Sequence, residues 1–166
     1  TRTQEDSIHP NECVAVELAD GRVYVNARDQ NGSDPATRLV AYSRDGGETF
    51  ERPFVGEPAI RSPVVQNSLL RMTASDHGGK QDLLVYCGAG DAKQRRDLTL
   101  LTSTDETKTW GQTTILHPGP SAYCDLVKMN DKKFGVLFEA GGKLYGEILF
   151  AAVSLDDLTP RKETGR

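Results

Sequence analysis

Apolar and polar residues alternate over short stretches of the chain, and glycine, proline and aspartate separate these stretches. Residues 13–18 and 23–27 alternate on either side of Asp20 and Gly21, which predicts a hairpin because this pair tolerates the positive φ of a tight turn. No segment of about ten residues or more has the 3.6-residue period of a helix. The chain is therefore expected to be all-β, with further strands at residues 38–43, 68–72, 83–87, 98–103, 113–116, 125–128, 134–138 and 144–153.

Composition fits a folded domain and excludes several classes of protein. Hydrophobic residues make up 37% of the 166 residues and charged residues 27%, and the net charge is −4. This slight acidity argues against a nucleic-acid-binding protein. No apolar run approaches the roughly 20 residues that a membrane helix needs. Cys13, Cys87 and Cys124 are far apart and have no neighbouring His pair, so a zinc site is not expected.

One short motif occurs twice, sixty residues apart. It is Ser-x-Asp-x-Gly-x-Thr-aromatic at residues 43–50, and the second copy, at residues 103–110, has Thr107 in place of the glycine. The aspartate can accept backbone N–H bonds within such a turn, the glycine can take positive φ, and the aromatic ring can cover the apolar side. Both copies follow a predicted strand, so a structural role is expected for Ser43, Asp45, Gly47, Phe50, Ser103, Asp105 and Trp110.

This motif resembles the Asp-box of sialidases and related β-propellers. A repeat of about 60 residues fits propeller blades of four strands each. The resemblance implies a partial six-bladed β-propeller, with about three four-stranded antiparallel blades over residues 1–158 and a polar tail at residues 159–166. Because a complete propeller of this kind has six blades, the N-terminal half of the domain is an expected partner of this chain.

The resemblance to sialidases extends to charged residues near the N-terminus and in the middle of the chain. Glu12 and, sixteen residues later, Arg28 match a segment that supplies a catalytic Glu and an arginine that binds the substrate carboxylate. Arg95 matches a second substrate-binding arginine by its register with the second Asp-box. Its neighbour Arg96 is the alternative assignment.

Tyr123 matches the nucleophile of the family, and Glu139 matches an acidic residue that orients the remaining arginine of a triad. A sialic acid carries a carboxylate beside its anomeric carbon, so a carboxylate nucleophile would be repelled, whereas a neutral tyrosine is not. A free phenol has a pKa near 10, so Glu12 is expected to take its proton as general base. Arginines suit the sugar carboxylate because they form paired, charge-assisted hydrogen bonds.

The activity that the resemblance implies is retaining exo-α-sialidase hydrolysis. The substrates would be terminal sialic acids of glycoproteins, glycolipids or oligosaccharides, and a covalent glycosyl-tyrosine would form as an intermediate. This chemistry requires neither a metal nor an organic cofactor.

Each of these residues also has an ordinary interpretation when it is taken alone. Tyr123 can be a half-buried tyrosine of a strand or loop, Glu12 a solvated residue at a strand edge, and Arg28 and Arg95 surface cations. The rival function is a non-catalytic Asp-box propeller that binds glycans or proteins, which the boxes do not exclude because they are structural. The ordered set of Glu, Arg, Arg and Tyr favours the enzyme, since a binding module has no reason to keep it.

Two elements that the resemblance implies have no match in this sequence. They are the first arginine of the triad and the loop Asp that serves as general acid/base. Both normally lie in the N-terminal half of the domain, so the isolated 166 residues are expected to hydrolyse sialosides poorly. The compartment stays open between lysosomal, secreted and other locations, because a sequon at Asn31 and the free cysteines point in different directions.

Overall fold

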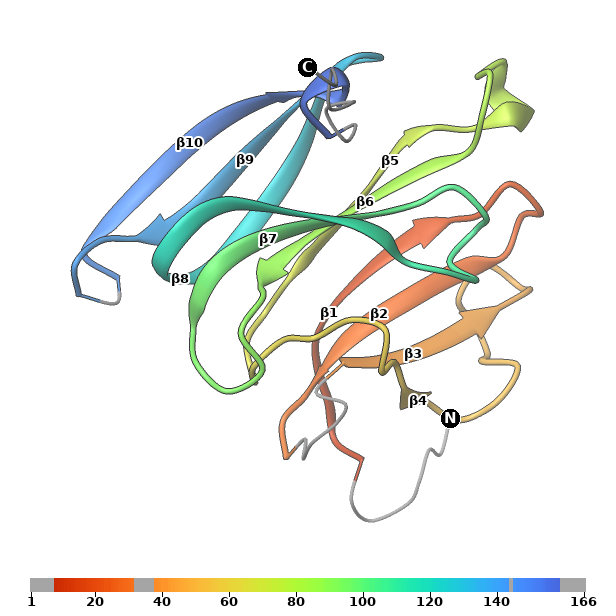
Figure 1. The fold of residues 1–166 in the computed structure, drawn as a ribbon. Helices are drawn as coiled ribbons and strands as arrows, with labels where there is room; N and C mark the ends of the chain where they lie inside the picture. The colour runs from red at the N-terminus through yellow and green to blue at the C-terminus, as the bar shows by residue number, and fades with distance from the viewer. Residues whose placement is uncertain (1–7, 32–37, 144, 159–166) are drawn as a thin grey trace, which may run out of the picture.

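The computed structural model describes residues 8–31, 38–143 and 145–158, and within them it contains ten antiparallel strands and two short 3₁₀ turns. A four-stranded sheet has the order β1-β2-β3-β4, and a six-stranded sheet has the order β10-β9-β8-β7-β6-β5 (Figure 1). The expected all-β class is confirmed. The elements are β1 (Pro10–Glu17), β2 (Val23–Asp29), β3 (Arg38–Ser43), β4 (Val55–Gly56), β5 (Ser68–Thr73), η1 (Ser75–His77), β6 (Leu83–Ala89), β7 (Arg96–Ser103), β8 (Gly111–Asn130), β9 (Lys133–Ala140), β10 (Glu147–Ser154) and η2 (Leu155–Leu158).

The strands that the alternating pattern predicted are present, and their hairpins close as expected. Strands β1 and β2 pair across the predicted turn, where Gly21 has a φ of 80°. The segments predicted at residues 68–72 and 83–87 pair as β5 and β6. Strand β4 was not predicted, because its two residues, Val55 and Gly56, are too short a segment to show alternation.

Strand β8 corrects one expectation. The sequence predicted separate strands at residues 113–116 and 125–128, whereas the structure has one strand of 20 residues through both. Its first half pairs with β7 and its second half pairs with β9. Pro118, Gly119 and Pro120 lie between the halves. The ladder with β7 shifts register there and so tolerates prolines, which cannot donate a backbone hydrogen bond. The sheet therefore curls around β8 instead of ending at it (Figure 1).

Strand β6 is buried on both faces and holds the rest of the fold in position. On one face, Val85 packs with Leu100 of β7 and Val136 of β9, in the cluster that fills the curl of the six-stranded sheet. On the other face, Leu84 packs in a second cluster with Tyr24 of the first sheet. Burial on both faces explains why β6 is a continuous apolar run rather than an alternating one.

The two Asp-box motifs form the same turn, one directly after β3 and the other directly after β7. In the first box the Ser43 hydroxyl donates to Asp45 Oδ1 (2.7 Å) and accepts from the Gly47 N–H (2.9 Å), while the Thr49 N–H donates to Asp45 Oδ1 (2.9 Å). The equivalent bonds of the second box measure 2.9, 3.0 and 2.9 Å. The expected structural turn is confirmed. The aromatic residues that follow the boxes and pack on the core clusters are Phe50 and Trp110.

The two boxes differ in backbone conformation and in their contacts with other strands. In the first, Gly46 and Gly47 take the positive φ values of 74° and 99°, whereas in the second Glu106 takes a φ of 59°. The Glu106 carboxylate accepts hydrogen bonds from both terminal nitrogens of Arg71 in β5 (2.8 and 2.7 Å) and from the N–H of Ala19 between β1 and β2 (2.6 Å). The second box therefore joins the two sheets.

Two further expectations concern the chain ends and membranes. The predicted polar tail at residues 159–166 lies outside the described residues. The extent of the propeller domain, residues 1–158, stays a prediction. Among the residues that the structure describes, no helix is long and apolar enough to cross a membrane.

Candidate active site

The chain topology brings the five residues that the sequence singled out to one end of the two sheets. Glu12 lies near the start of β1, Arg28 near the end of β2, and Arg95 in the loop between β6 and β7. Tyr123 lies in the middle of β8, and Glu139 lies near the end of β9. We call these five residues the tyrosine cluster. They lie at the opposite end of the sheets from the Asp-boxes, because β3 and β7 each begin near the cluster and end at a box.

The central contact of the tyrosine cluster joins two residues that are 111 positions apart in the chain. The Tyr123 hydroxyl donates to Glu12 Oε1 at 2.5 Å. Arg28 Nη1 lies 2.6 Å from Glu12 Oε2 and 3.5 Å from the Tyr123 hydroxyl. A carboxylate thus bridges a phenol and a guanidinium.

Backbone strain places the Glu12 carboxylate. Glu12 has a φ of 30°, and the pairing of β1 with β2 slips at this point, between Asn11 and Cys13. The Asn11 side chain accepts a hydrogen bond from the Glu12 N–H (2.7 Å). Such a bulge re-aims a side chain at the end of a strand, and a non-glycine residue at positive φ persists only where the surrounding structure holds it.

The environment of Tyr123 keeps its hydroxyl protonated at neutral pH. The hydrogen bond to Glu12 raises the pKa of Tyr123, and partial burial and the negative charge of Glu12 act in the same direction. The Arg28 charge opposes them and lowers that pKa. A phenol with a raised pKa attacks an electrophile only if a base removes its proton during the reaction, and the Glu12 oxygen that accepts this proton is already in contact with it.

Arg95 lies over the tyrosine ring and is held from two sides. Its guanidinium carbon is 5.7 Å from the centroid of the Tyr123 ring. Its Nη2 donates to the Val64 carbonyl (3.1 Å), and its Nη1 donates to the hydroxyl of Tyr145. The alternative assignment, Arg96, is paired at 3.0 Å with its neighbour Asp97. Of the two arginines, Arg95 is therefore the one placed beside the tyrosine.

Glu139 supports the backbone beneath the tyrosine. Its Oε2 accepts a hydrogen bond from the Tyr123 N–H at 3.1 Å. The resemblance implied a different contact, with an arginine, and among the described residues no arginine forms an ion pair with Glu139. Its role as the brace of a further arginine stays a prediction.

A cavity of about 450 Å³ opens beside Tyr123 and Glu139. Nearby polar groups are only partly satisfied: Arg28 Nε and the Ser121 hydroxyl are buried and have no hydrogen-bond partner within the described part of the chain. Buried polar groups are usually paired, so each of these two groups has capacity for a further hydrogen bond. The other residues that line the cavity are Cys13, Val14, Gln66, Ser68, Cys124, Asp125, Leu137, Phe138 and Ile148.

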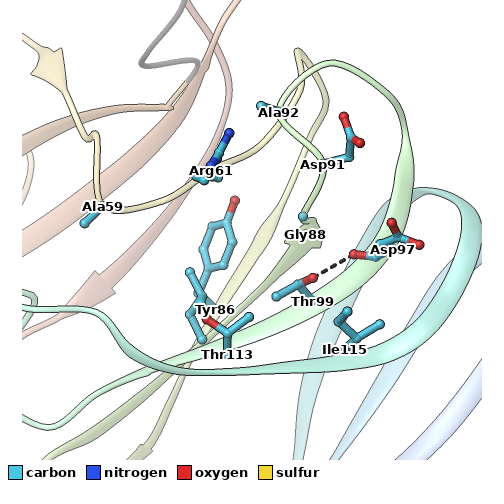
Figure 2. Close-up of a pocket in the computed structure, with 12 residues that line it drawn as sticks. Ala59, Arg61, Tyr86, Gly88, Asp91, Ala92, Asp97, Thr99, Thr113 and Ile115 are labelled. Atoms are coloured by element: carbon cyan, nitrogen blue, oxygen red, sulfur yellow. Dashed lines mark hydrogen bonds between the residues drawn. The ribbon is translucent and has the colours of Figure 1, made fainter.

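A second cavity, of about 440 Å³, lies against one face of β6, β7 and β8 (Figure 2). Figure 2 shows Arg61, Gly88 and Asp91 among the residues that line it. Its carboxylates are already engaged, because Asp91 accepts the N–H groups of Lys93 and Gln94 (2.7 and 2.8 Å). This cavity therefore has fewer groups available for chemistry than the tyrosine cluster does. No group of three His, Cys, Asp or Glu residues in the described ranges could hold a metal ion.

Two residues beside the site, Arg38 and Tyr145, were not predicted from the sequence as parts of it. Arg38 is fully buried and donates to Asn26 (2.8 Å) and to the Val65 carbonyl (3.0 Å), which fixes the loop beside Arg95. Tyr145 was assigned only to the last strand. Neither residue belongs to a motif, and their roles depend on contacts with segments 27 and 50 positions away.

Comparison with known proteins shows the family of the chain. A family model described as a BNR repeat-like domain matches residues 2–137. The chain belongs to this BNR repeat-like family. A sialidase of Micromonospora viridifaciens is 31% identical over 128 residues, which is 76% of this chain and 19% of that protein. A sialidase of Bacteroides fragilis is 28% identical over 150 residues, which is 89% of this chain and 26% of that protein.

Solved structures agree on the fold of this BNR repeat-like chain. A Hadza microbial sialidase has a TM-score of 0.75 and 26% identity over 90% of this chain and 28% of its own. The neighbouring structures are sialidase β-propellers, so the expected partial propeller is confirmed. The chain spans 19% and 26% of the two curated relatives that it matches.

Proposed function

We propose that this chain forms part of a retaining exo-α-sialidase, in which Tyr123 is the nucleophile and Glu12 its general base. The observation that carries the proposal is the hydrogen bond of 2.5 Å between the Tyr123 hydroxyl and Glu12 Oε1, with Arg28 beside both. The sialidase relatives and the BNR repeat-like family support the same assignment. The substrates are terminal sialic acids of glycoproteins, glycolipids or oligosaccharides.

In the first step, the Tyr123 oxygen forms a bond to the anomeric carbon while its proton passes to Glu12. The glycosidic bond breaks, and the leaving alcohol takes a proton from a general acid. The expected acid is an Asp that this chain does not supply. Water then attacks the anomeric carbon and gives a proton to the same Asp, while the leaving Tyr123 oxygen takes its proton back from Glu12. Two inversions thus give net retention.

Arg28 and Arg95 bind the carboxylate of the sugar. Arg28 is buried and its Nε has no hydrogen-bond partner among the residues that the structure describes, so it has capacity for a further acceptor. Arg95 is placed over the tyrosine ring, where a planar guanidinium can donate two parallel bonds to a carboxylate. A neutral phenol between two cations can approach this anionic substrate without the repulsion that a carboxylate nucleophile would meet.

The proposal includes a division of the site between this chain and an N-terminal half of the propeller. The general acid Asp and the first arginine of the triad are expected there. The isolated 166-residue chain is therefore expected to hydrolyse a fluorogenic sialoside poorly or not at all, and the complete propeller is expected to hydrolyse it. Normal turnover by the isolated chain would contradict this division.

The test of the mechanism is Tyr123→Phe in the complete propeller. We expect hydrolysis to fall by at least about 10³-fold while binding of sialic acid persists, because only the nucleophilic oxygen is removed. Tyr42→Phe is the matched control, since the Tyr42 hydroxyl contacts Thr107 at the Asp-box end (2.9 Å). Unchanged hydrolysis in Tyr123→Phe would remove this residue from the mechanism. A complete protein that binds sialylated glycans without cleaving them would favour the alternative, a non-catalytic Asp-box propeller.

A further inference from the structure

Tyr145 has a backbone conformation that its own side chain disfavours. It lies in the turn between β9 and β10 and has a φ of 65°. This left-handed region costs a bulky residue energy that glycine does not incur, and glycines stand close by at Gly141, Gly142 and Gly146. More than half of the Tyr145 side chain is exposed, so core packing does not account for a tyrosine here.

Tyr145 contacts Arg95, one residue of the tyrosine cluster. Its hydroxyl accepts a hydrogen bond from Arg95 Nη1, which comes from a loop 50 residues earlier in the chain. The same arginine donates to the Val64 carbonyl and lies over the ring of Tyr123. The Tyr145 hydroxyl thus holds one terminal nitrogen of the Arg95 guanidinium, and the Val64 carbonyl holds the other.

We propose that Tyr145 is a positioning residue that holds the Arg95 guanidinium over Tyr123 and borders the place where a substrate carboxylate binds. Because the Tyr145 oxygen accepts from Arg95, its own proton is free to donate to an anionic oxygen that Arg95 attracts. The ligand class is a carboxylate-bearing sugar. This part of the inference rests on the proposed function, whereas the restraint of Arg95 does not.

Two substitutions separate the hydroxyl from the backbone strain. Tyr145→Phe keeps the ring and removes the oxygen that accepts from Arg95. Tyr145→Gly removes the whole side chain and relieves the positive φ, so its melting temperature is expected to stay unchanged or to rise. In the complete propeller, we expect both variants to raise KM for a fluorogenic sialoside by about tenfold and to leave kcat within about twofold, because a binding contact is lost and the nucleophile is not.

A second readout does not depend on turnover. We expect ¹⁵N relaxation of the Arg95 guanidinium to show a more mobile side chain in Tyr145→Phe than in the unsubstituted protein, while the guanidinium of Arg71, bound to Glu106, stays unchanged. Unchanged KM together with unchanged Arg95 mobility would overturn the inference. Absence of turnover in the unsubstituted complete protein would count against the proposed function alone, and the mobility of Arg95 would still decide whether Tyr145 restrains it.

Discussion

Polar residues at the two ends of the sheets differ in how fully they are hydrogen-bonded. At the Asp-box end, Asp105 is satisfied from several sides, since it accepts from the Thr109 N–H (2.9 Å), the Thr109 hydroxyl (2.6 Å) and the Ser103 hydroxyl (2.9 Å). At the other end, Arg28 Nε has no hydrogen-bond partner in the described part of the chain, and Glu12 is held at a φ of 30°. Satisfied polar groups stabilise a fold. The box end is not wholly satisfied, because Glu106 has a φ of 59° and Trp110 Nε1 is buried without a hydrogen-bond partner among the described residues. From this comparison we propose a stabilising role for the boxes and a catalytic role for the tyrosine cluster.

Among the substitutions that compare the two ends of the sheets, Glu12→Gln is expected to have the largest effect. Removing the general base should lower kcat/KM for a sialoside by about 10²- to 10⁴-fold in the complete propeller, with little change in melting temperature. Glu17→Gln is the matched control, because it makes the same substitution in β1 at the other end of the strand. Equal activity of the two variants would contradict the role of Glu12 as general base.

An intermediate effect on stability is expected from Glu106→Ala. The substitution removes the carboxylate that accepts from Arg71 and Ala19, so the free energy of unfolding should fall by about 2 kcal/mol. Glu48→Ala, an exposed carboxylate of the first box, should change it by no more than about 0.5 kcal/mol. Urea unfolding of the isolated chain measures both values. Equal losses would show that the second box does not join the sheets.

The smallest effect concerns acid stability. Hydrogen bonds from Thr49 lower the pKa of Asp45 to about 2, and those from Thr109 lower the pKa of Asp105. A carboxyl whose pKa is lower in the folded chain stabilises it above the unfolded value of about 4, and this contribution is lost as pH falls towards about 2. Melting temperatures measured between pH 5 and pH 2 should therefore fall less steeply in Asp45→Asn and in Asp105→Asn. Slopes equal to that of the unsubstituted chain would contradict this account of the boxes.

Local signals in the sequence predicted the features that depend on neighbouring residues. The β1–β2 hairpin follows from Asp20 and Gly21, and the box turns follow from spacings within eight residues. The tyrosine cluster was predicted only through resemblance, because nothing local connects Glu12 with Tyr123 across 111 positions. Continuity of β8 through its prolines depends on register with β7, and composition does not encode that register.

Two other residues whose positions depend on tertiary contacts were not predicted. Arg38 looks like a strand-end cation, yet it is fully buried and bonded to the Val65 carbonyl. Tyr145 stands in a glycine-rich turn, and its importance depends on the position of Arg95. In both cases the partner comes from a segment that only the packing of two sheets brings near.

The measurement that tests the central claim most directly is covalent trapping of the nucleophile. The complete propeller would be incubated with a fluorinated sialosyl donor whose glycosyl-enzyme hydrolyses slowly, then digested and examined by mass spectrometry. The account predicts a sialosyl adduct on the peptide that contains Tyr123, and its absence in Tyr123→Phe. An adduct on a carboxylate such as Glu12 or Glu139, or turnover of the donor with no adduct on any peptide, would contradict the account.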